Sequence, residues 1–268
     1  MPATDARESG VTNGNGVILE ARDLVKRYGS VAALRGASFS ARAGEVVALI
    51  GDNGAGKSTL VKCLSGAEVP DSGEILLDGE VVTLDSPTAA RSRGIETVYQ
   101  DLAVAPDLDP AANLFLGREL RRGGLLGRLG MLDKVEMRRR AVVEFARLGV
   151  QLQSVEVPIG ALSGGQRQSV AVARSVVWAS KVVFMDEPTA ALGVVQRERV
   201  LDVIKRVRDT GISVVLISHN MPEVLAVADR IEVLRLGRRV ARFAAADATL
   251  EQLVGAMTGA LTNEGDAA

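Results

Sequence analysis

Histidine, cysteine and aromatic residues are scarce in this sequence. Its 268 residues contain one cysteine, Cys63, and one histidine, His219. A single cysteine excludes an intrachain disulfide and fits a reducing compartment. Aromatic residues make up only 3 % of the chain, so each of Tyr28, Tyr99 and Trp178 is a candidate for a specific role.

Long apolar runs and clusters of basic residues are also absent. Because no run of about 18 apolar residues occurs, the chain is not expected to span a membrane by itself. The formal net charge is −1, and without a basic tract it argues against a nucleic-acid partner. Residues 1–16 are polar and have no apolar signal segment, so we expect a disordered tail. With 47 % hydrophobic residues, the rest suits one large α/β domain, or a core with small subdomains.

Apolar periodicity predicts strands at the start of the chain and alternating strands and helices at its end. Strands are expected within 17–25, 36–50 and 73–84, with a hairpin turn at Asp78-Gly79. After residue 180 we expect strands at 181–185 and 213–218, helices at 194–210 and from Pro222, a hairpin turning at Gly237, and a helix within 249–259. This alternation predicts parallel βαβ units.

The middle of the chain, from about 101 to 178, has a helical period. Its Gly-rich stretch 121–130 is predicted to be a loop. The following segment, 132–150, is predicted to be a helix with one apolar stripe, formed by Val135, Val142, Val143, Phe145, Ala146 and Leu148.

Three apolar runs stop abruptly at polar residues. "EVVALI" continues into "GDNGAGKST", "KVVFM" into Asp186-Glu187-Pro188, and "SVVLI" into Ser218-His219. Ligands of open parallel sheets bind beyond the carboxyl ends of the strands. We therefore expect the three polar sets to share one edge of a sheet, although a lone histidine at a strand end is more often structural.

The first set, Gly51–Ser58, fits the phosphate-binding pattern G-x-x-x-x-G-K-[ST] between a strand and a helix. Its glycines let backbone N–H groups face phosphate oxygens, Lys57 reaches the β- and γ-phosphates, and the helix N-terminus adds positive potential. Ser58 would bind Mg²⁺ and Thr59 would support the α-phosphate; the alternative is a chance match. The predicted nucleotide contacts are Gly51, Asp52, Asn53, Gly54, Ala55, Gly56, Lys57, Ser58 and Thr59.

The second set contains two acids with different expected roles. Asp186, at the strand end, would hold Mg²⁺ directly or through water, and Glu187 would polarise the attacking water. The alternative is an acidic turn closed by Pro188.

A further motif is "LSGGQ" at 162–166. Ser163 is a natural helix N-cap, and Gly164-Gly165 expose the N–H groups of the first helical turn. One nucleotide has one triphosphate, which Gly51–Ser58 already accommodates. A second phosphate-binding helix end therefore suggests a nucleotide held between two molecules, unless this is an ordinary capped helix.

Together these motifs make the chain resemble the nucleotide-binding subunits of ABC transporters over residues 17–260. The resemblance implies an α/β P-loop NTPase fold with a RecA-like core, an N-terminal antiparallel β subdomain, an inserted helical subdomain at about 101–178, and a C-terminal tail at 261–268. It also implies ATP and Mg²⁺ as ligands and ATP hydrolysis as the reaction.

The resemblance assigns roles that the residues alone do not. Gln100 matches the Q-loop, which contacts Mg²⁺ and senses the γ-phosphate, and His219 matches the histidine that contacts the γ-phosphate. Tyr28 matches the aromatic residue that stacks on adenine. Lys57, Gln100, Glu187 and His219 are therefore the expected catalytic set, and Ser58, Gln100 and Asp186 the expected metal ligands. A second chain would supply the signature residues Ser163, Gly164, Gly165 and Gln166.

Two positions depart from the usual pattern. Gly193 stands where the family has the D-loop aspartate, and Ser169 where arginine is common. "DEPTAALGVVQ", "SHNMPEV" and "LVGAMTG" resemble ATPases of simple-sugar importers of the ribose, xylose and fructose type. This implies a homodimer at the cytoplasmic face of the membrane, held by transmembrane permease subunits, with a periplasmic-type sugar-binding protein as an indirect partner. The alternatives are an importer of another solute, an exporter, or a soluble ABC protein without a transport role.

Overall fold

The computed structural model describes residues 16–98, 104–152, 154–190 and 192–261. The predicted tails, apart from Gly16 and Leu261, and the predicted site residue Gln100 with its neighbour Tyr99 lie outside the described residues.

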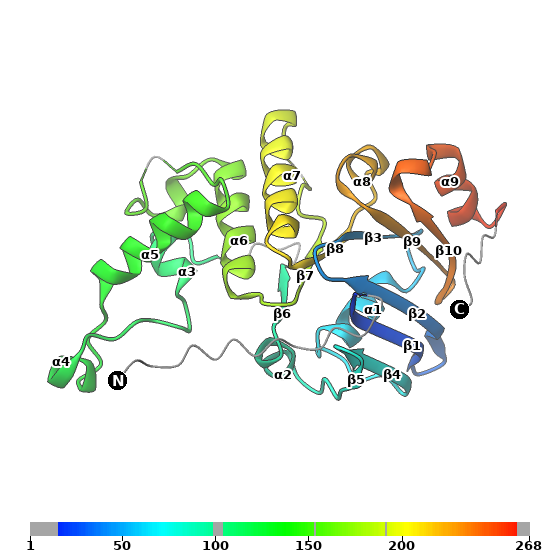
Figure 1. The fold of residues 1–268 in the computed structure, drawn as a ribbon, viewed down its shortest axis with the longest axis horizontal. Helices are drawn as coiled ribbons and strands as arrows, with labels where there is room; N and C mark the ends of the chain where they lie inside the picture. The colour runs from blue at the N-terminus through cyan, green and yellow to red at the C-terminus, as the bar shows by residue number, and fades with distance from the viewer. Residues whose placement is uncertain (1–15, 99–103, 153, 191, 262–268) are drawn as a thin grey trace.

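The described strands form two sheets (Figure 1). The smaller sheet is antiparallel and has the order β2-β1-β4-β5, formed by β1 (Val17–Tyr28), β2 (Val31–Arg42), β4 (Ser72–Leu77) and β5 (Glu80–Val81). The predicted turn between the last two strands is confirmed, because Asp78 and Gly79 both have positive φ, 54° and 82°. This sheet is the expected N-terminal β subdomain.

The larger sheet has the order β10-β9-β3-β8-β7-β6. It consists of β3 (Val46–Ile50), β6 (Ile95–Val98), β7 (Val182–Asp186), β8 (Ser213–Ile217), β9 (Arg230–Arg235) and β10 (Arg238–Ala244). All neighbours are parallel except β9 and β10, which form the predicted hairpin around Gly237. The predicted α/β P-loop architecture is confirmed by this sheet and the helices that cover it.

Alternate side chains of the central strands supply two separate cores. In β7, Val183 and Met185 pack toward the helices α6 (Gly164–Trp178) and α7 (Val194–Asp209). Val182 and Phe184 pack toward the antiparallel sheet and α1 (Lys57–Leu64). A strand buried on both faces cannot slip by one residue without exchanging its two cores, so the position of its last residue is fixed.

Cys63 lies fully buried in the second of these cores. Burial raises the pKa of its thiol to about 11. The thiol is therefore protonated at neutral pH, and it fills space in the core rather than acting as a nucleophile.

The described part of segment 101–178 contains four α-helices and one 3₁₀ turn, drawn in green on the left of Figure 1. They are α3 (Pro110–Leu114), α4 (Gly124–Arg128), α5 (Lys134–Arg147), η1 (Ile159–Ala161) and α6. The loop predicted at 121–130 is wrong in part, because α4 forms one short helix within it. Gly127 allows this close turn, since a Cβ there would lie 1.7 Å from the Arg122 carbonyl oxygen.

The predicted apolar stripe of α5 is wrong in most of its positions. Val135, Val142 and Val143 are 73 %, 50 % and 56 % exposed, and Ala146 is exposed as well. Phe145 and Leu148 of the predicted stripe are buried, and the other buried side chains of this face are Met137 and Ala141. The four exposed residues and the four buried residues each follow the helical repeat on a different face of α5, and the sequence pattern does not say which face meets the core.

The remaining described elements are α2 (Pro87–Ser92), α8 (Met221–Val227), η2 (Ala245–Asp247) and α9 (Leu250–Thr258). Helix α8 begins one residue before Pro222 because Asn220 caps it, accepting from the Glu223 N–H. In the described part of the chain, no helix combines the length and the apolar character needed to cross a membrane.

Candidate functional site

The carboxyl ends of β3, β7 and β8 lie next to one another, as predicted. Leu49 of β3 pairs with Ile217 of β8, and Ile217 also pairs with Asp186 of β7. This register brings the loop after Ile50, the acids at the end of β7 and His219 to one edge of the sheet. The three polar sets singled out in the sequence therefore form a single site.

The loop Gly51–Gly56 crosses this edge and leads into α1. Gly51 and Gly56 have φ of 151° and 103°, and a Cβ at either would lie 2.2 Å and 2.7 Å from the carbonyl oxygens of Leu234 and Ala33. Glycine is thus required for the loop to pass between β9 and β2. At Gly54, by contrast, φ is 81° and a Cβ would meet no atom within 4 Å in the described part of the chain, so these residues leave the loop open on that side.

The first turn of α1 presents unpaired donors. Gly56 caps the helix without a side chain, and the first N–H with a described acceptor is that of Leu60, which donates to Gly56 O at 2.9 Å. Within the described residues, the N–H groups of Lys57, Ser58 and Thr59 donate to no acceptor. These groups and the positive end of the helix form a site for an anion. Asp52 and Asn53 are exposed at its rim, whereas Ala55 is buried beneath it.

Lys57 is folded over this loop. Its Nζ donates to the carbonyl oxygens of Gly51 and Asp52 at 2.6 Å and 3.0 Å. Burial lowers the pKa of Lys57, and the nearby carboxylates of Glu187, Asp52 and Asp186 act in the opposite direction.

The acids at the end of β7 differ in their surroundings. Burial raises the pKa of Asp186, the charge of Glu187 adds to the effect, and Lys57 opposes it. Glu187 has φ of 49°, a left-handed conformation that costs a non-glycine residue on the order of 1–3 kcal/mol. Its N–H donates to Ile217 O at 2.9 Å, so the neighbouring strand β8 holds this strained residue in place.

His219 contacts Glu187 directly. Its Nδ1 lies 2.7 Å from Glu187 Oε1, and its backbone N–H donates to the same oxygen at 3.0 Å. The His219 side chain is 80 % exposed while that of Glu187 is 16 % exposed. The imidazole therefore has one side fixed by Glu187 and the other turned outward.

The donor set at this edge fits Mg²⁺ bound together with a nucleotide. Among the described residues, no cluster of three or more His, Cys, Asp or Glu side chains could hold a metal ion by itself. Mg²⁺ usually takes one or two protein oxygens and completes its shell with phosphates and water. Asp186, whose charge acts on Lys57, and the exposed Ser58 next to Lys57 in the chain supply such oxygens.

Tyr28 lies at the end of β1 and is 42 % exposed. The ammonium group of Lys26 stands 5.6 Å from the centre of its ring. The hairpin of β1 and β2 borders the glycine loop, because Gly56 packs on Ala33. A planar base stacked on the exposed ring face is therefore compatible with this position.

The signature residues begin α6. Ser163 Oγ accepts from the Gln166 N–H at 3.3 Å, and Gln166 Oε1 accepts from the Ser163 N–H at 3.1 Å, which forms a capping box. A Cβ at Gly165 would lie 2.4 Å from Cγ of Gln196 on α7, whereas a Cβ at Gly164 would meet no atom of the described residues within 4 Å. Packing within the chain thus requires glycine at 165 but not at 164.

The sequence reasoning missed a buried acid behind the site, Glu223 of α8. Its carboxylate accepts from the Thr189 hydroxyl and from Asn220 Nδ2 at 2.8 Å, and it forms an ion pair with Arg197 of α7. Because Glu223 is four residues after His219, a helix capped at Asn220 turns it back toward the sheet. That cap was the only signal available in the sequence.

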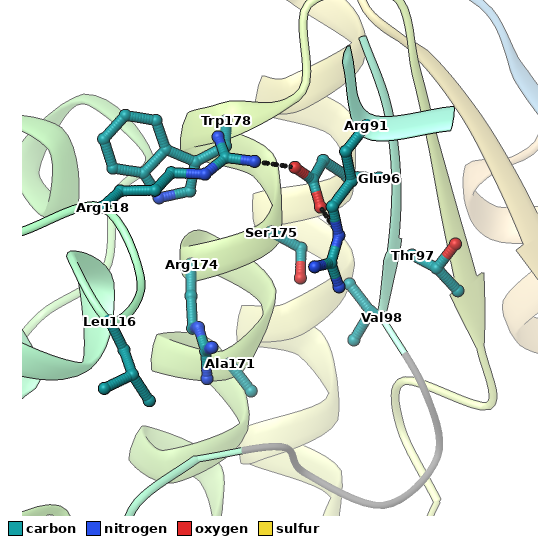
Figure 2. Close-up of a pocket in the computed structure, with 10 residues that line it drawn as sticks. All are labelled: Arg91, Glu96, Thr97, Val98, Leu116, Arg118, Ala171, Arg174, Ser175 and Trp178. Carbon is teal, nitrogen blue, oxygen red and sulfur yellow. Dashed lines mark hydrogen bonds and ion pairs between the residues drawn. The ribbon is translucent and has the colours of Figure 1, made fainter. Parts of the chain in front are cut away.

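A cleft of about 140 Å³ lies beside the helical segment (Figure 2). Glu96 of β6 forms ion pairs with Arg118 at 2.7 Å and with Arg91 of α2 at 3.5 Å. Arg118 also stacks 4.8 Å from the ring centre of Trp178, whose Nε1 donates to Leu114 O at 2.9 Å. Burial, together with Arg91, lowers the pKa of Arg174, which points into the same cleft. With three arginines and one glutamate, the cleft is cationic.

Comparison with known proteins gives a consistent result. Residues 34–190 match the family model described as ABC transporter. The chain is 53 % identical to the fructose import ATP-binding protein FrcA of Rhizobium meliloti, over 91 % of this chain and 94 % of that protein. It is 42 % identical to the xylose/arabinose import ATP-binding protein XylG of Sulfolobus acidocaldarius, over 90 % and 94 %. It is 41 % identical to the ribose import ATP-binding protein RbsA of Yersinia pestis, over 90 % of this chain and 46 % of that protein.

Solved structures show the same fold. An ATP-binding cassette of an ABC transporter in its ADP conformation is 26 % identical with a TM-score of 0.75, covering 90 % of this chain and 95 % of that one. A dimeric post-hydrolysis state of another cassette, bound to ADP and phosphate, is 25 % identical with a TM-score of 0.69, covering 85 % and 99 %.

Proposed function

Because the chain belongs to the ABC transporter family, we propose that it is the ATP-hydrolysing subunit of an importer for a simple sugar. The observation that supports this most directly is the meeting of Gly51–Ser58, Asp186-Glu187 and His219 at one edge of the sheet. Import of a sugar is supported by the relatives named above for fructose, xylose/arabinose and ribose import. The membrane subunits and the binding protein contact the sugar, so they determine which sugar is carried.

The residues at the sheet edge have different roles in ATP binding and hydrolysis. The free N–H groups of α1 and Lys57 bind the phosphates, Thr59 supports the α-phosphate, and Tyr28 stacks on adenine. Ser58 and Asp186, with Gln100 outside the described residues, would hold Mg²⁺, which would neutralise charge on the phosphates. Glu187 polarises the attacking water and accepts its proton, while His219, held by Glu187, faces the γ-phosphate.

A second copy of the chain completes the site. Ser163, Gly164, Gly165 and Gln166 form the N-terminus of α6, a different helix from the one that Lys57 begins, and they serve the nucleotide held by the partner chain. The open position of Gly164 supports this arrangement, because no described residue of its own chain requires a glycine there. Residues 17–260 would form this ATPase domain, with 101–178 as its helical subdomain.

The cationic cleft is our candidate contact for the permease. It joins β6, which leads into the segment holding Gln100, to the signature helix α6. A permease helix bound in the cleft would be displaced when α6 moves as the dimer closes. The chain would accordingly act at the cytoplasmic face of the membrane through its partners.

Reconstitution tests this proposal against its alternatives. Purified protein should hydrolyse ATP without sugar, whereas sugar uptake by vesicles should require the membrane subunits and the binding protein. Sugar uptake by vesicles that contain this subunit alone would refute the proposal that transport requires the partner subunits. Copurification with no membrane subunit would favour a soluble ABC protein, and transport out of the vesicles would favour an exporter.

A further inference from the structure

We propose that Glu223 is a positioning residue that sets the contact between Glu187 and His219, an inference that rests on the proposed function. Glu187 and His219 lie on two different turns, one after β7 and one after β8. Their 2.7 Å contact depends on how far apart these two turns are held.

The carboxylate of Glu223 bridges the two turns. Its Oε2 accepts from the hydroxyl of Thr189, two residues after Glu187. Its Oε1 accepts at 2.8 Å from Nδ2 of Asn220, the residue after His219. Asn220 is anchored a second time, since its N–H donates to Ser218 Oγ at 3.1 Å. Each turn that carries a reacting side chain is therefore bound to the same carboxylate.

Burial makes these contacts strong. The side chain of Glu223 is only 7 % exposed, and Thr189 is 4 % exposed. A buried carboxylate that lost a partner would remain desolvated and unpaired, so each donor has a large effect on its position.

Arg197 supplies the opposite charge from the first turn of α7. Its Nε lies 2.8 Å from Glu223 Oε1 in an ion pair, although it lacks the alignment of a hydrogen bond. Its Nη2 donates to Leu192 O at 3.3 Å. The neighbouring Gln196 packs on Gly165 of the signature helix. The first turn of α7 thus connects the Glu223 carboxylate with the signature helix α6, which serves the nucleotide of the partner chain.

Removing one donor at a time tests the role. Thr189→Val deletes the hydroxyl with little change of shape, and Thr189→Ser retains it as the matched control. Glu223→Gln keeps the side-chain length but removes the charge. We expect Thr189→Val and Glu223→Gln to lower kcat for ATP by about 10- to 100-fold, the range for a misplaced catalytic group, with KM changed less than about twofold. Thr189→Ser should retain most of the activity.

The single histidine gives a second readout that does not require turnover. In tag-free protein the imidazole signals of His219 are free of overlap from other histidines, and the ¹⁵N shifts of the ring report the contact of Nδ1. Thr189→Val and Glu223→Gln should move these signals, whereas Thr189→Ser should leave them in place. Val200→Ala, which opens a cavity at a fully buried position of α7, controls for loss of stability and should leave kcat and the His219 signals unchanged.

The outcomes separate this proposal from the proposed function. If wild-type protein hydrolyses ATP, and Thr189→Val and Glu223→Gln match it in kcat and in the His219 signals, Glu223 has no positioning role. If Val200→Ala produces the same losses, the effect is one of stability and the role is also excluded. A wild-type protein without ATPase activity contradicts the proposed function, while the His219 signals still decide the role of Glu223. Should Glu223→Gln fail to fold by circular dichroism, Thr189→Val and Arg197→Gln decide in its place.

Discussion

The glycine loop before α1 and the signature turn before α6 both present a helix N-terminus, but they are built in opposite ways. Helix α1 has a glycine cap with a left-handed backbone and no side-chain acceptor. Helix α6 has a complete capping box made by Ser163 and Gln166. Helix α1 therefore leaves the N–H donors of its first turn free for a ligand, whereas helix α6 satisfies part of its N–H donors with its own cap.

This difference indicates which end binds nucleotide first. A helix end whose N–H groups lack acceptors gains the full value of each bond to a phosphate. A helix end that is already capped gains less, and it binds mainly where another surface brings the phosphate to it. We therefore expect a single chain to bind ATP through Lys57 and its neighbours, and the signature to contribute only in a dimer.

The largest expected effect comes from Glu187→Gln. It should reduce turnover by about 10²- to 10⁴-fold, because water activation is lost while phosphate binding is kept. The stalled protein should then accumulate as an ATP-bound dimer, seen by gel filtration with and without MgATP. Adding Ser163→Ala to Glu187→Gln should shift it back toward monomer. A Glu187→Gln protein that stays monomeric at high concentration with ATP would contradict the shared site.

Lys57→Ala should weaken ATP binding by a single chain about 10- to 100-fold, as expected for the loss of hydrogen bonds worth about 1.5–3 kcal/mol to a charged group. Ser163→Ala should leave single-chain binding unchanged. Titration with a fluorescent ATP analogue at concentrations where the protein is monomeric compares the two. Equal losses in both variants would remove the distinction between the two helix ends.

The two caps should also differ in their contribution to stability. Gly56→Ala places a Cβ 2.7 Å from a backbone oxygen at a φ of 103°, and strain of this kind costs on the order of 1–3 kcal/mol. Ser163→Ala removes an ordinary N-cap, which costs about 1 kcal/mol. Urea unfolding measures both, with Gly54→Ala as a control that shares the positive φ but has open space for its Cβ.

Asp186→Asn should stabilise the nucleotide-free protein while weakening its response to Mg²⁺. The pKa of Asp186 is raised in the folded state, so its ionised form lowers stability as pH rises from the ordinary aspartate value of about 3.9 through the raised value. The melting temperature of Asp186→Asn should thus exceed that of wild type at pH 7, and the difference should vanish near pH 3.5. Asp247→Asn, at an exposed position of η2, is the control and should show no such trend.

Gly193→Asp should have the smallest effect on nucleotide affinity, whether at the glycine loop before α1 or at the signature turn before α6. Gly193 caps α7 without a side-chain bond, and an aspartate adds a cap worth only a few tenths of a kcal/mol. Its Cβ would come within 2.7 Å of Gln196 Oε1, so the side-chain amide of Gln196, whose Cγ packs on Gly165, must turn. We expect the Hill coefficient for ATP to change and single-chain affinity to stay constant. A large loss of affinity without a change in cooperativity would indicate misfolding.

The sequence predicted the sheet edge well but the helical segment less well. The strand ends at Ile50, Asp186 and Ile217 follow from short apolar runs that end in polar residues. Each of these three strands is buried on both faces, which leaves one possible register. Helix α5 has two apolar stripes, and only packing against α3 and α6 selects the one with Met137 and Phe145. The periodicity alone contains no information about that choice.

The sequence by itself therefore determined the chemistry of the site, because loop, acid and histidine are each adjacent to a strand whose end is fixed locally. Only the tertiary structure decided how these groups are held together. Glu223 meets Thr189, 34 residues away in the chain, and Glu96 meets Arg118 across the cleft. Such contacts depend on which elements pack side by side, and a single buried carboxylate gains its partners only when the whole sheet and its helices are in place.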